Sequence, residues 1–148
     1  MTANSPTRLF WFLDQPKRKE CLGAWEEYVG EFDEVLGYTA LGDFILRNSQ
    51  TSEYLVFYPQ RPGNNAKNYG PFESLAEFRR KGFDEQSFAD YCLRPDDVYV
   101  LVDRLGPLGE SEVYFPVPFP CLGGSGELST FDKGNVWIYV DLLGQSSL

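Results

Sequence analysis

Apolar residues recur at helical spacing near the start of the chain. Between residues 22 and 32 they fall three or four positions apart, which places them on one face of a helix. Asp14 can cap a helix and Pro16 suits a first turn, so we expect the helix to begin at residues 14–16. Gly30 should weaken its last turn. The apolar face would consist of Leu22, Trp25, Val29 and Phe32.

Two shorter helices are predicted in the middle of the chain. Residues 74–77 read Ser-Leu-Ala-Glu, a capping box in which a serine and a glutamate satisfy the first backbone N–H groups. Gly82 would end this helix. Asp84 then opens a second helix, which Pro95 closes.

The segment at residues 98–105 fits two structures. Its residues have high strand propensity, yet its apolar positions follow the i, i+3, i+4, i+7 spacing of a helix. Pro95, Asp96 and Asp97 resemble a helical first turn, and Gly106-Pro107 is a stop signal. We therefore predict a helix here. Its apolar stripe would be Val98, Leu101, Val102 and Leu105.

Strand patterns occur in three parts of the chain. Residues 38–46 and 53–58 are predicted to pair as a hairpin, with the polar residues 48–52 as the turn. Residues 61–70 read as a long loop. Residues 113–117 are extended, but the prolines at 116, 118 and 120 exclude a central strand.

The segment at residues 135–142 is apolar on both faces and predicts an internal strand. Helical and strand patterns do not alternate as regular βαβ units, which favours an α+β fold with a mainly antiparallel mixed sheet. The 148 residues contain no linker and no repeat, so residues 1–148 are expected to form a single domain.

The net charge of the chain limits the kinds of molecule that it can bind. The chain has 22 acidic and 13 basic residues, for a net charge of −9. This balance argues against nucleic acid as a partner, because phosphate contacts need Lys and Arg. The absence of a long apolar run argues against a membrane partner, and the lack of a secretory signal predicts a cytoplasmic protein. Three widely spaced cysteines predict free thiols and neither a disulfide nor a zinc site.

Catalytic chemistry finds little support in the sequence. The chain has no histidine, which excludes a Ser-His or Cys-His nucleophile. The residue types present still allow a catalytic pair of carboxylates, as in glycoside hydrolysis. The acids closest together in the sequence are Asp96-Asp97 and Glu110/Glu112. The glycine-rich residues 123–126 lack the Lys-Ser/Thr of a phosphate-binding loop. We expect a structural turn with positive φ at Gly123 or Gly124, and neither a cofactor nor a metal.

The acidic residues are concentrated in one part of the sequence, and this concentration says more about function than any catalytic motif. Residues 20–46 contain seven acids and no base. A solvated helix face would explain such a run, whereas the alternative is a surface that attracts a basic protein partner. In that alternative, exposed aromatic residues among the acids would anchor the partner. The candidate partner-binding residues are Glu26, Glu27, Glu31, Asp33 and Glu34, with Glu110 and Glu112 as a second patch.

The C-terminal half resembles a bacterial family. The motifs that carry the resemblance are RLGPLG at 104–109, EVYFP at 112–116, LGG at 122–124 and LLGQ at 142–145, with weaker similarity at 37–43 and 69–72. Over residues 35–145 the sequence is similar to the C-terminal domain of type VI secretion immunity proteins, which often follows a GAD-like domain. The SUKH superfamily of toxin-neutralising proteins has a comparable layout but fewer shared motifs.

The resemblance implies a non-enzymatic cytosolic protein that binds and neutralises a cognate toxin, often a nuclease. An acidic surface suits a basic toxin of that kind. The alternative is a module that binds a small ligand or a peptide, which the many aromatic residues and the proline-rich segment at 116–120 would serve. A carboxylate-dependent enzyme is the third hypothesis. The sequence gives no indication of the oligomeric state.

Overall fold

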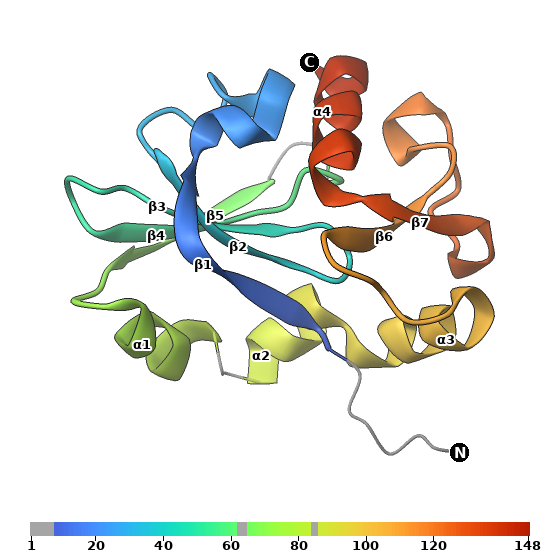
Figure 1. Ribbon diagram of the computed structural model, residues 1–148, viewed down its shortest axis with the longest axis horizontal. Coiled ribbons are helices and arrows are strands. Elements are labelled where there is room, and N and C mark those ends of the chain that lie inside the picture. Colours follow the sequence, from blue (N-terminus) through green and yellow to red (C-terminus); the bar gives the residue numbers. More distant parts are fainter. Residues whose placement is uncertain (1–7, 62–64, 84–85) are drawn as a thin grey trace.

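A five-stranded antiparallel sheet forms the centre of the computed structural model, which describes residues 8–61, 65–83 and 86–148. Its strands follow one another in chain order from one edge of the sheet to the other (Figure 1). A second sheet pairs β6 with β7, also antiparallel. The strands are β1 Phe10–Arg18, β2 Glu34–Thr39, β3 Phe44–Arg47, β4 Glu53–Phe57, β5 Ala66–Pro71, β6 Glu112–Pro116 and β7 Phe131–Asn135.

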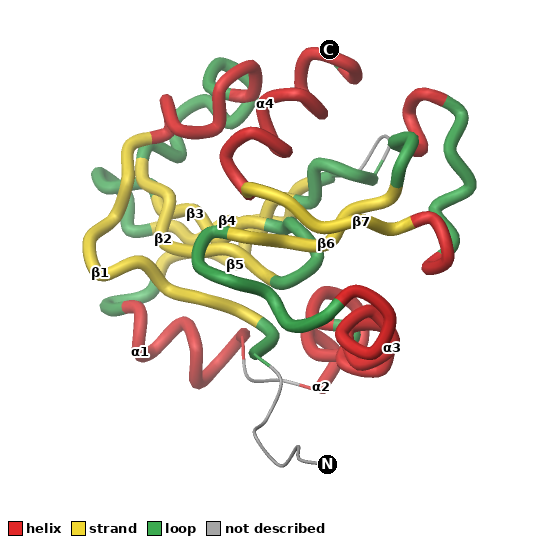
Figure 2. The backbone as a smooth tube through the Cα atoms, turned by 45° about the vertical axis from the view of Figure 1, so that its right-hand side comes forward, coloured by secondary structure: helices red, strands yellow, loops and turns green. Residues whose placement is uncertain are grey.

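Helices cover both faces of the five-stranded sheet. Figures 1 and 2 show α1, α2 and α3 below it, and α4 with the helical segment after β1 above it. The α-helices are α1 Leu75–Phe78, α2 Gln86–Phe88, α3 Pro95–Leu105 and α4 Val136–Ser147. Short 3₁₀ helices (η1 Lys19–Trp25, η4 Pro120–Leu122, η5 Leu128–Thr130) and π-helical turns (η2 Arg79–Phe83, η3 Ala89–Leu93) complete the chain. This arrangement confirms the α+β fold.

The core lies in layers on either side of the sheet because strand side chains alternate between its faces. In β4, Leu55 and Phe57 pack toward η1 and α4, while Tyr54 and Val56 pack toward α1 and η3. Both sets are buried. A third cluster joins α3 to the small sheet. No helix in the described part of the chain is long and apolar enough to cross a membrane.

Several predicted elements are confirmed. Residues 95–105 form α3, with Pro95 in its first turn rather than simply closing the preceding helix. Ser74 caps α1 by accepting a hydrogen bond from the Glu77 N–H. The β3–β4 hairpin has the polar turn expected at residues 48–52, where Asn48 accepts a hydrogen bond from the Gln50 N–H. The predicted helix start at Asp84 falls outside the described residues.

The start of the chain differs from the prediction. The helix expected from residues 14–16 is absent there, because residues 10–18 form the edge strand β1 and the helical turn begins only at Lys19. The predicted strand over residues 38–46 is instead the tight β2–β3 hairpin, turning at residues 40–43. Of the expected loop at 61–70, residues 66–70 belong to β5.

The predicted internal strand at residues 135–142 is wrong, because this segment begins α4. Asn135 is its N-cap, and the Asn135 side chain accepts hydrogen bonds from the N–H groups of Trp137 and Ile138. The buried positions of α4 are Val136, Tyr139, Val140 and Leu143, which recur at helical spacing. Apolar residues on the opposite side of the helix obscured this pattern in the sequence.

Candidate partner-binding face

The helical turn η1 packs closely against α4. The Ala24 N–H donates to Oδ1 of Asp141 at 2.9 Å, and the Trp25 indole N–H donates to the carbonyl of Val140 at 3.0 Å. A Cβ atom on Gly144 would lie 2.8 Å from Nε1 of Trp25, so only glycine allows this approach. The two elements therefore form a firmly joined surface.

Three acids of the predicted patch follow η1 in the turn at residues 26–31. Glu27 and Glu31 are exposed and Glu26 is half-buried. Among the described residues, no Lys or Arg lies within ion-pair distance of these three carboxylates. The Lys19 ammonium donates to the Gly30 carbonyl at 2.7 Å and so helps to fix the turn. These acids directly follow η1, the element that packs against α4.

The other two acids of this patch have partners inside the fold. Asp33 accepts hydrogen bonds from the Ser49 backbone N–H at 2.9 Å and from its hydroxyl at 2.6 Å. Slight burial raises the pKa of Asp33, but these hydrogen bonds outweigh it and leave the pKa below its ordinary value. Glu34 pairs with Arg47 at 2.7 Å. Both side chains therefore stabilise contacts within the fold, whether or not they also meet a partner.

The second acidic patch stands apart from the first along α4. Glu112 lies in β6 opposite Asn135, the residue that caps α4, and its Oε1 accepts a hydrogen bond from the Gly109 N–H at 2.6 Å. Glu110 is exposed next to it. The η1 contacts, by contrast, are with Val140, Asp141 and Gly144. The two predicted patches therefore border different ends of the helix.

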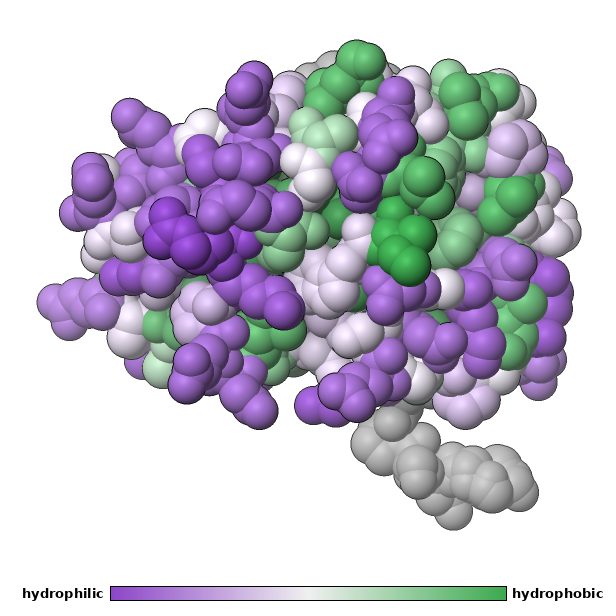
Figure 3. Space-filling view, turned by 45° about the horizontal axis from the view of Figure 1, so that its top comes forward, coloured by the Kyte–Doolittle hydropathy of each residue, from purple (hydrophilic) through white to green (hydrophobic). Residues whose placement is uncertain are grey.

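Apolar side chains are exposed on α4 and on the β6–β7 connection. On α4, 63% of Ile138 and 48% of Leu142 are exposed, one helical turn apart. Leu148 follows the helix and Leu122 lies on the β6–β7 connection, and both are exposed. Figure 3 shows hydrophobic surface gathered over this part of the molecule, beside a largely hydrophilic surface on the left of the view. An apolar centre with a charged rim is the usual anatomy of a protein interface.

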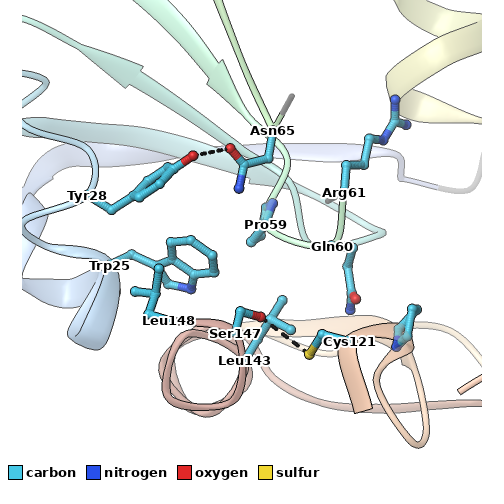
Figure 4. A pocket seen from close by; sticks show the side chains of 11 residues that line it. Trp25, Tyr28, Pro59, Gln60, Arg61, Asn65, Cys121, Leu143, Ser147 and Leu148 are labelled. Carbon is cyan, nitrogen blue, oxygen red and sulfur yellow. Dashed lines mark hydrogen bonds between the residues drawn. The ribbon is translucent and has the colours of Figure 1, made fainter. Parts of the chain in front are cut away.

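A cavity of about 420 Å³ opens at the C-terminal end of α4 (Figure 4). Residues from four separate parts of the chain line it: Trp25 and Tyr28, residues 59–61 with Asn65, the β6–β7 connection, and the end of the chain from Leu143. Tyr28 lies on one wall, 48% exposed, and its hydroxyl donates to Oδ1 of Asn65. In Figure 4, Gln60, Arg61 and Cys121 lie on the side away from Tyr28, and Pro120 also lines the cavity.

Gln60 is the unusual residue of this cavity. Its amide nitrogen and oxygen are both buried, and neither forms a hydrogen bond of normal geometry with the described residues. The amide lies near the Tyr139 hydroxyl, which itself donates to the Gly42 carbonyl at 3.3 Å. Buried polar groups normally have a partner. Nothing in the local sequence around Gln60 marks its side chain as buried.

The glycine-rich turn at residues 123–126 follows two residues that line the cavity, Pro120 and Cys121. Gly123 has a φ of 94°, the positive value predicted for this turn. Gly124 needs glycine for a different reason, since a Cβ there would lie 1.9 Å from the Pro118 carbonyl oxygen. Both glycines lie in the same β6–β7 connection as Pro120 and Cys121, which line the cavity.

A smaller cavity of about 120 Å³ adjoins Gln60 and contains Asp43. Burial raises the pKa of Asp43 to about 7, although the charges of Arg61 and Arg94 pull it down. The Cys92 thiol lies 3.7 Å from Oδ2 of Asp43. Cys92 is buried, Cys21 is half-buried and Cys121 is exposed, and all three are free thiols. Within the described residues, no cluster of metal-ligating side chains forms.

The comparison with protein families identifies the C-terminal half of the chain. The family described as "T6SS immunity protein Tdi1, C-terminal" matches residues 73–147, just over half of the sequence. The chain belongs to this family. The Tdi1 C-terminal match contains all four α-helices, β6 and β7, and so confirms the resemblance seen in the motifs between residues 104 and 145.

The wider comparisons concern the fold. The structure is similar to "Crystal structure of Atu4351 from Agrobacterium tumefaciens", with a TM-score of 0.62 and 19% sequence identity. The similarity covers 93% of this chain and 66% of that chain, and at this identity it shows the fold alone. No curated protein matches the sequence significantly.

The Tdi1 C-terminal match covers only part of the candidate partner-binding face, by which we mean α4, the β6–β7 connection, the cavity and the predicted acids. Residues of α4 and of the β6–β7 connection lie within the matched range, as do Glu110 and Glu112. Tyr28, Gln60 and the acids at 26–34 lie before it. The face therefore joins a segment shared with the family to a segment outside the match.

Proposed function

We propose that this protein is a non-enzymatic immunity protein that binds a cognate secreted toxin in the cytoplasm and so neutralises it. Membership of a type VI secretion immunity family is the observation that carries the proposal. Two features of the surface support it: Ile138 and Leu142 are exposed on α4, and Glu26, Glu27 and Glu31, which follow the element packed against α4, have no ion-pair partner among the described residues. Catalysis is not required for this role, since occupying the toxin's functional surface suffices.

The charge of the face suits a basic toxin. Glu26, Glu27 and Glu31 present like charges on one turn, and the whole chain carries a net charge of −9. A nuclease is a fitting partner because a protein that grips phosphates exposes Lys and Arg. Opposite potentials speed encounter, while buried apolar contacts slow dissociation. The acids would therefore govern association and the α4 residues would govern the lifetime of the complex.

A charge-reversal experiment tests this division. The triple variant Glu26→Lys, Glu27→Lys and Glu31→Lys should reduce the association rate with the neighbouring gene's toxin about tenfold or more at low salt. The matched control Glu73→Lys, Asp103→Lys and Asp132→Lys changes the net charge equally on exposed acids elsewhere. Stopped-flow binding and protection of toxin-expressing cells are the measurements. An association rate that stays constant between low and physiological salt contradicts the steering role.

A second candidate function rests on another cavity. A hollow of about 810 Å³ lies between β5 and η3, and Tyr58, Tyr69, Phe88 and Tyr91 line it. Aromatic lining and this volume suit a small ligand or a peptide. Saturable binding from a fragment screen at these residues, in a protein that binds no toxin, would favour this function over immunity.

A further inference from the structure

We infer that the outer edge of β5 binds an extended segment of a partner protein as a sixth strand, with an acidic residue of that segment beside Lys67 and an apolar residue in the hollow between β5 and η3. This inference rests on the second candidate function, binding at that hollow, and names the class of its occupant. Three observations support it: the backbone groups at the edge, the position of Lys67 and the aromatic lining of the hollow.

β5 is an edge strand, and its register with β4 shows which backbone groups point outward. Among the described strands, β5 pairs only with β4. The Tyr58 N–H donates to the Asn65 carbonyl at 2.7 Å, which identifies a hydrogen-bonded pair of the antiparallel ladder. Such pairs alternate along the ladder, so Lys67 also directs its N–H and C=O toward β4, whereas Ala66 and Asn68 direct theirs outward. These four outward groups can form hydrogen bonds with an added strand.

The opposite edge of the sheet, β1, is protected against strand addition. Its pairing with β2 shifts register between Phe12 and Lys17, and Pro16 lies within the irregular stretch. Lys17 and Arg18 then place two consecutive exposed cations on the strand. Irregular pairing, proline and charge are usual means of blocking an edge. In β5, by contrast, no proline lies between the outward groups, and Lys67 is the only charged residue.

Lys67 selects against a second copy of this chain as the added strand. When two copies pair antiparallel through all four outward groups, Ala66 of each lies opposite Asn68 of the other, and the two Lys67 residues lie opposite each other. Like charges directly opposite each other destabilise strand pairing, whereas opposite charges stabilise it. The edge therefore favours a different chain that has an acidic residue opposite Lys67.

The hollow favours an apolar residue two positions from that acid. Val56, which pairs with Lys67, packs in the same core cluster as Phe88, so Lys67 and the residue opposite it lie on the side of the hollow. The Lys67 ammonium lies 4.6 Å from the ring centre of Tyr69, which also lines the hollow. Residues two positions apart in a strand point to the same face. The next such residue therefore enters a space of about 810 Å³ with an aromatic lining, where Asp90 on η3 disfavours a second acid.

Two capped peptides test the edge on the full chain. Thr-Leu-Thr-Glu-Thr-Leu-Thr has an acid at its centre and a leucine two positions away on either side, so it fits in both chain directions. Thr-Leu-Thr-Lys-Thr-Leu-Thr differs only in the central charge. In an NMR titration, the glutamate peptide should shift the amide signals of Ala66 and Asn68 and bind about tenfold more tightly than the lysine peptide. Lys67→Glu should reverse this preference. Equal affinities for the two peptides, or no saturable binding at β5, would overturn the inference.

Two substitutions at Asn68 distinguish strand addition from other binding. Proline has no N–H, and at an outward position of an edge strand it removes no hydrogen bond to β4. Asn68→Pro should therefore abolish peptide binding. Asn68→Ala should retain it, because it loses the same side chain, which accepts a hydrogen bond from the Gly70 N–H at 2.7 Å, but keeps the backbone N–H. Dispersed NMR signals check that both variants fold. Peptide binding that survives Asn68→Pro, or that Asn68→Ala also abolishes, refutes strand addition.

The remaining outcomes identify a different occupant. If only small ligands bind in the hollow, strand addition is refuted and the second candidate function stands. Self-association of the unaltered protein that Asn68→Pro abolishes would assign the edge to a second copy and also overturn the inference. A toxin takes no part in these measurements, so immunity and strand addition at β5 can fail independently.

Discussion

Asp43 lies in the turn between β2 and β3, and 6% of its surface is exposed. Its surroundings bring together charged and titratable groups from several elements. Arg61 and Arg94 act on its carboxyl group through their charges, and the Cys92 thiol contacts it. Tyr58 and Tyr139 lie close enough for the Asp43 charge to raise their pKa values further. Burial nevertheless dominates, and the pKa of Asp43 rises to about 7.

This raised pKa makes stability fall as pH rises from about 4 to 7. The folded protein retains the Asp43 proton over a range in which the unfolded chain, with an ordinary pKa near 3.8, has lost it. The free energy of unfolding should decrease by up to about 1.4 kcal/mol per pH unit there. Urea denaturation at several pH values measures this slope. The absence of histidine leaves few other groups to titrate between pH 5 and 7.

Asp43→Asn is the matched variant for this experiment because it keeps the shape and removes the titration. Its unfolding free energy should vary much less with pH between 5 and 7 than that of the unaltered protein. Identical pH profiles for the two proteins would show that Asp43 ionises in the folded state with an ordinary pKa.

At the scale of elements, α4 shows what the sequence could and could not reveal. Asn135 could have been recognised as a helix cap, and Val136, Tyr139, Val140 and Leu143 follow helical spacing. The prediction of a strand failed because Ile138 and Leu142 are also apolar, although they are exposed. The same exposed residues that hid the helix are those that make its outer face suitable for a partner.

The junction of η1 with α4 gives a prediction at this scale. In Gly144→Ala, the new methyl group would lie 2.8 Å from Nε1 of Trp25 and 2.9 Å from Cβ of Ala24. Separating the two elements should cost about 1–3 kcal/mol of unfolding free energy, the usual range for overpacking. Chemical denaturation measures it. Ser146→Ala, an exposed substitution in the same helix, should leave stability nearly unchanged, and equal stability of the two variants would show that the junction is loose.

At the scale of the whole molecule, the acidic run was visible in the sequence and the cavity was not. The base-free stretch from residue 20 to 46 needs no fold to be noticed. The cavity, however, is assembled from Tyr28, Gln60, Cys121 and Leu143, which lie far apart in the chain. Only the packing of η1 and α4 on one face of the sheet brings them together. Local patterns predict elements, whereas such a site depends on long-range contacts.

The same long-range contacts predict that the family-matched half cannot fold alone. We propose that residues 1–148 form a single domain, although the Tdi1 C-terminal match begins at residue 73. The buried face of α4 packs against Trp25 and against Phe44 and Phe57 of the five-stranded sheet, all of which precede that point. Without residues 1–72, the chain keeps a two-stranded sheet and four described α-helices that have lost most of their core. An isolated two-stranded sheet is marginally stable at best.

A fragment comprising residues 73–148 should therefore lack a cooperative thermal transition and dispersed NMR signals, whereas the full chain unfolds in one transition. Adding residues 8–72 as a separate chain provides the control, because restored signals would show that the fragment failed for want of the sheet and not through damage. If residues 73–148 fold cooperatively on their own, the chain contains two domains. The cavity, which Tyr28 and residues of α4 line together, would then lie at a boundary between them.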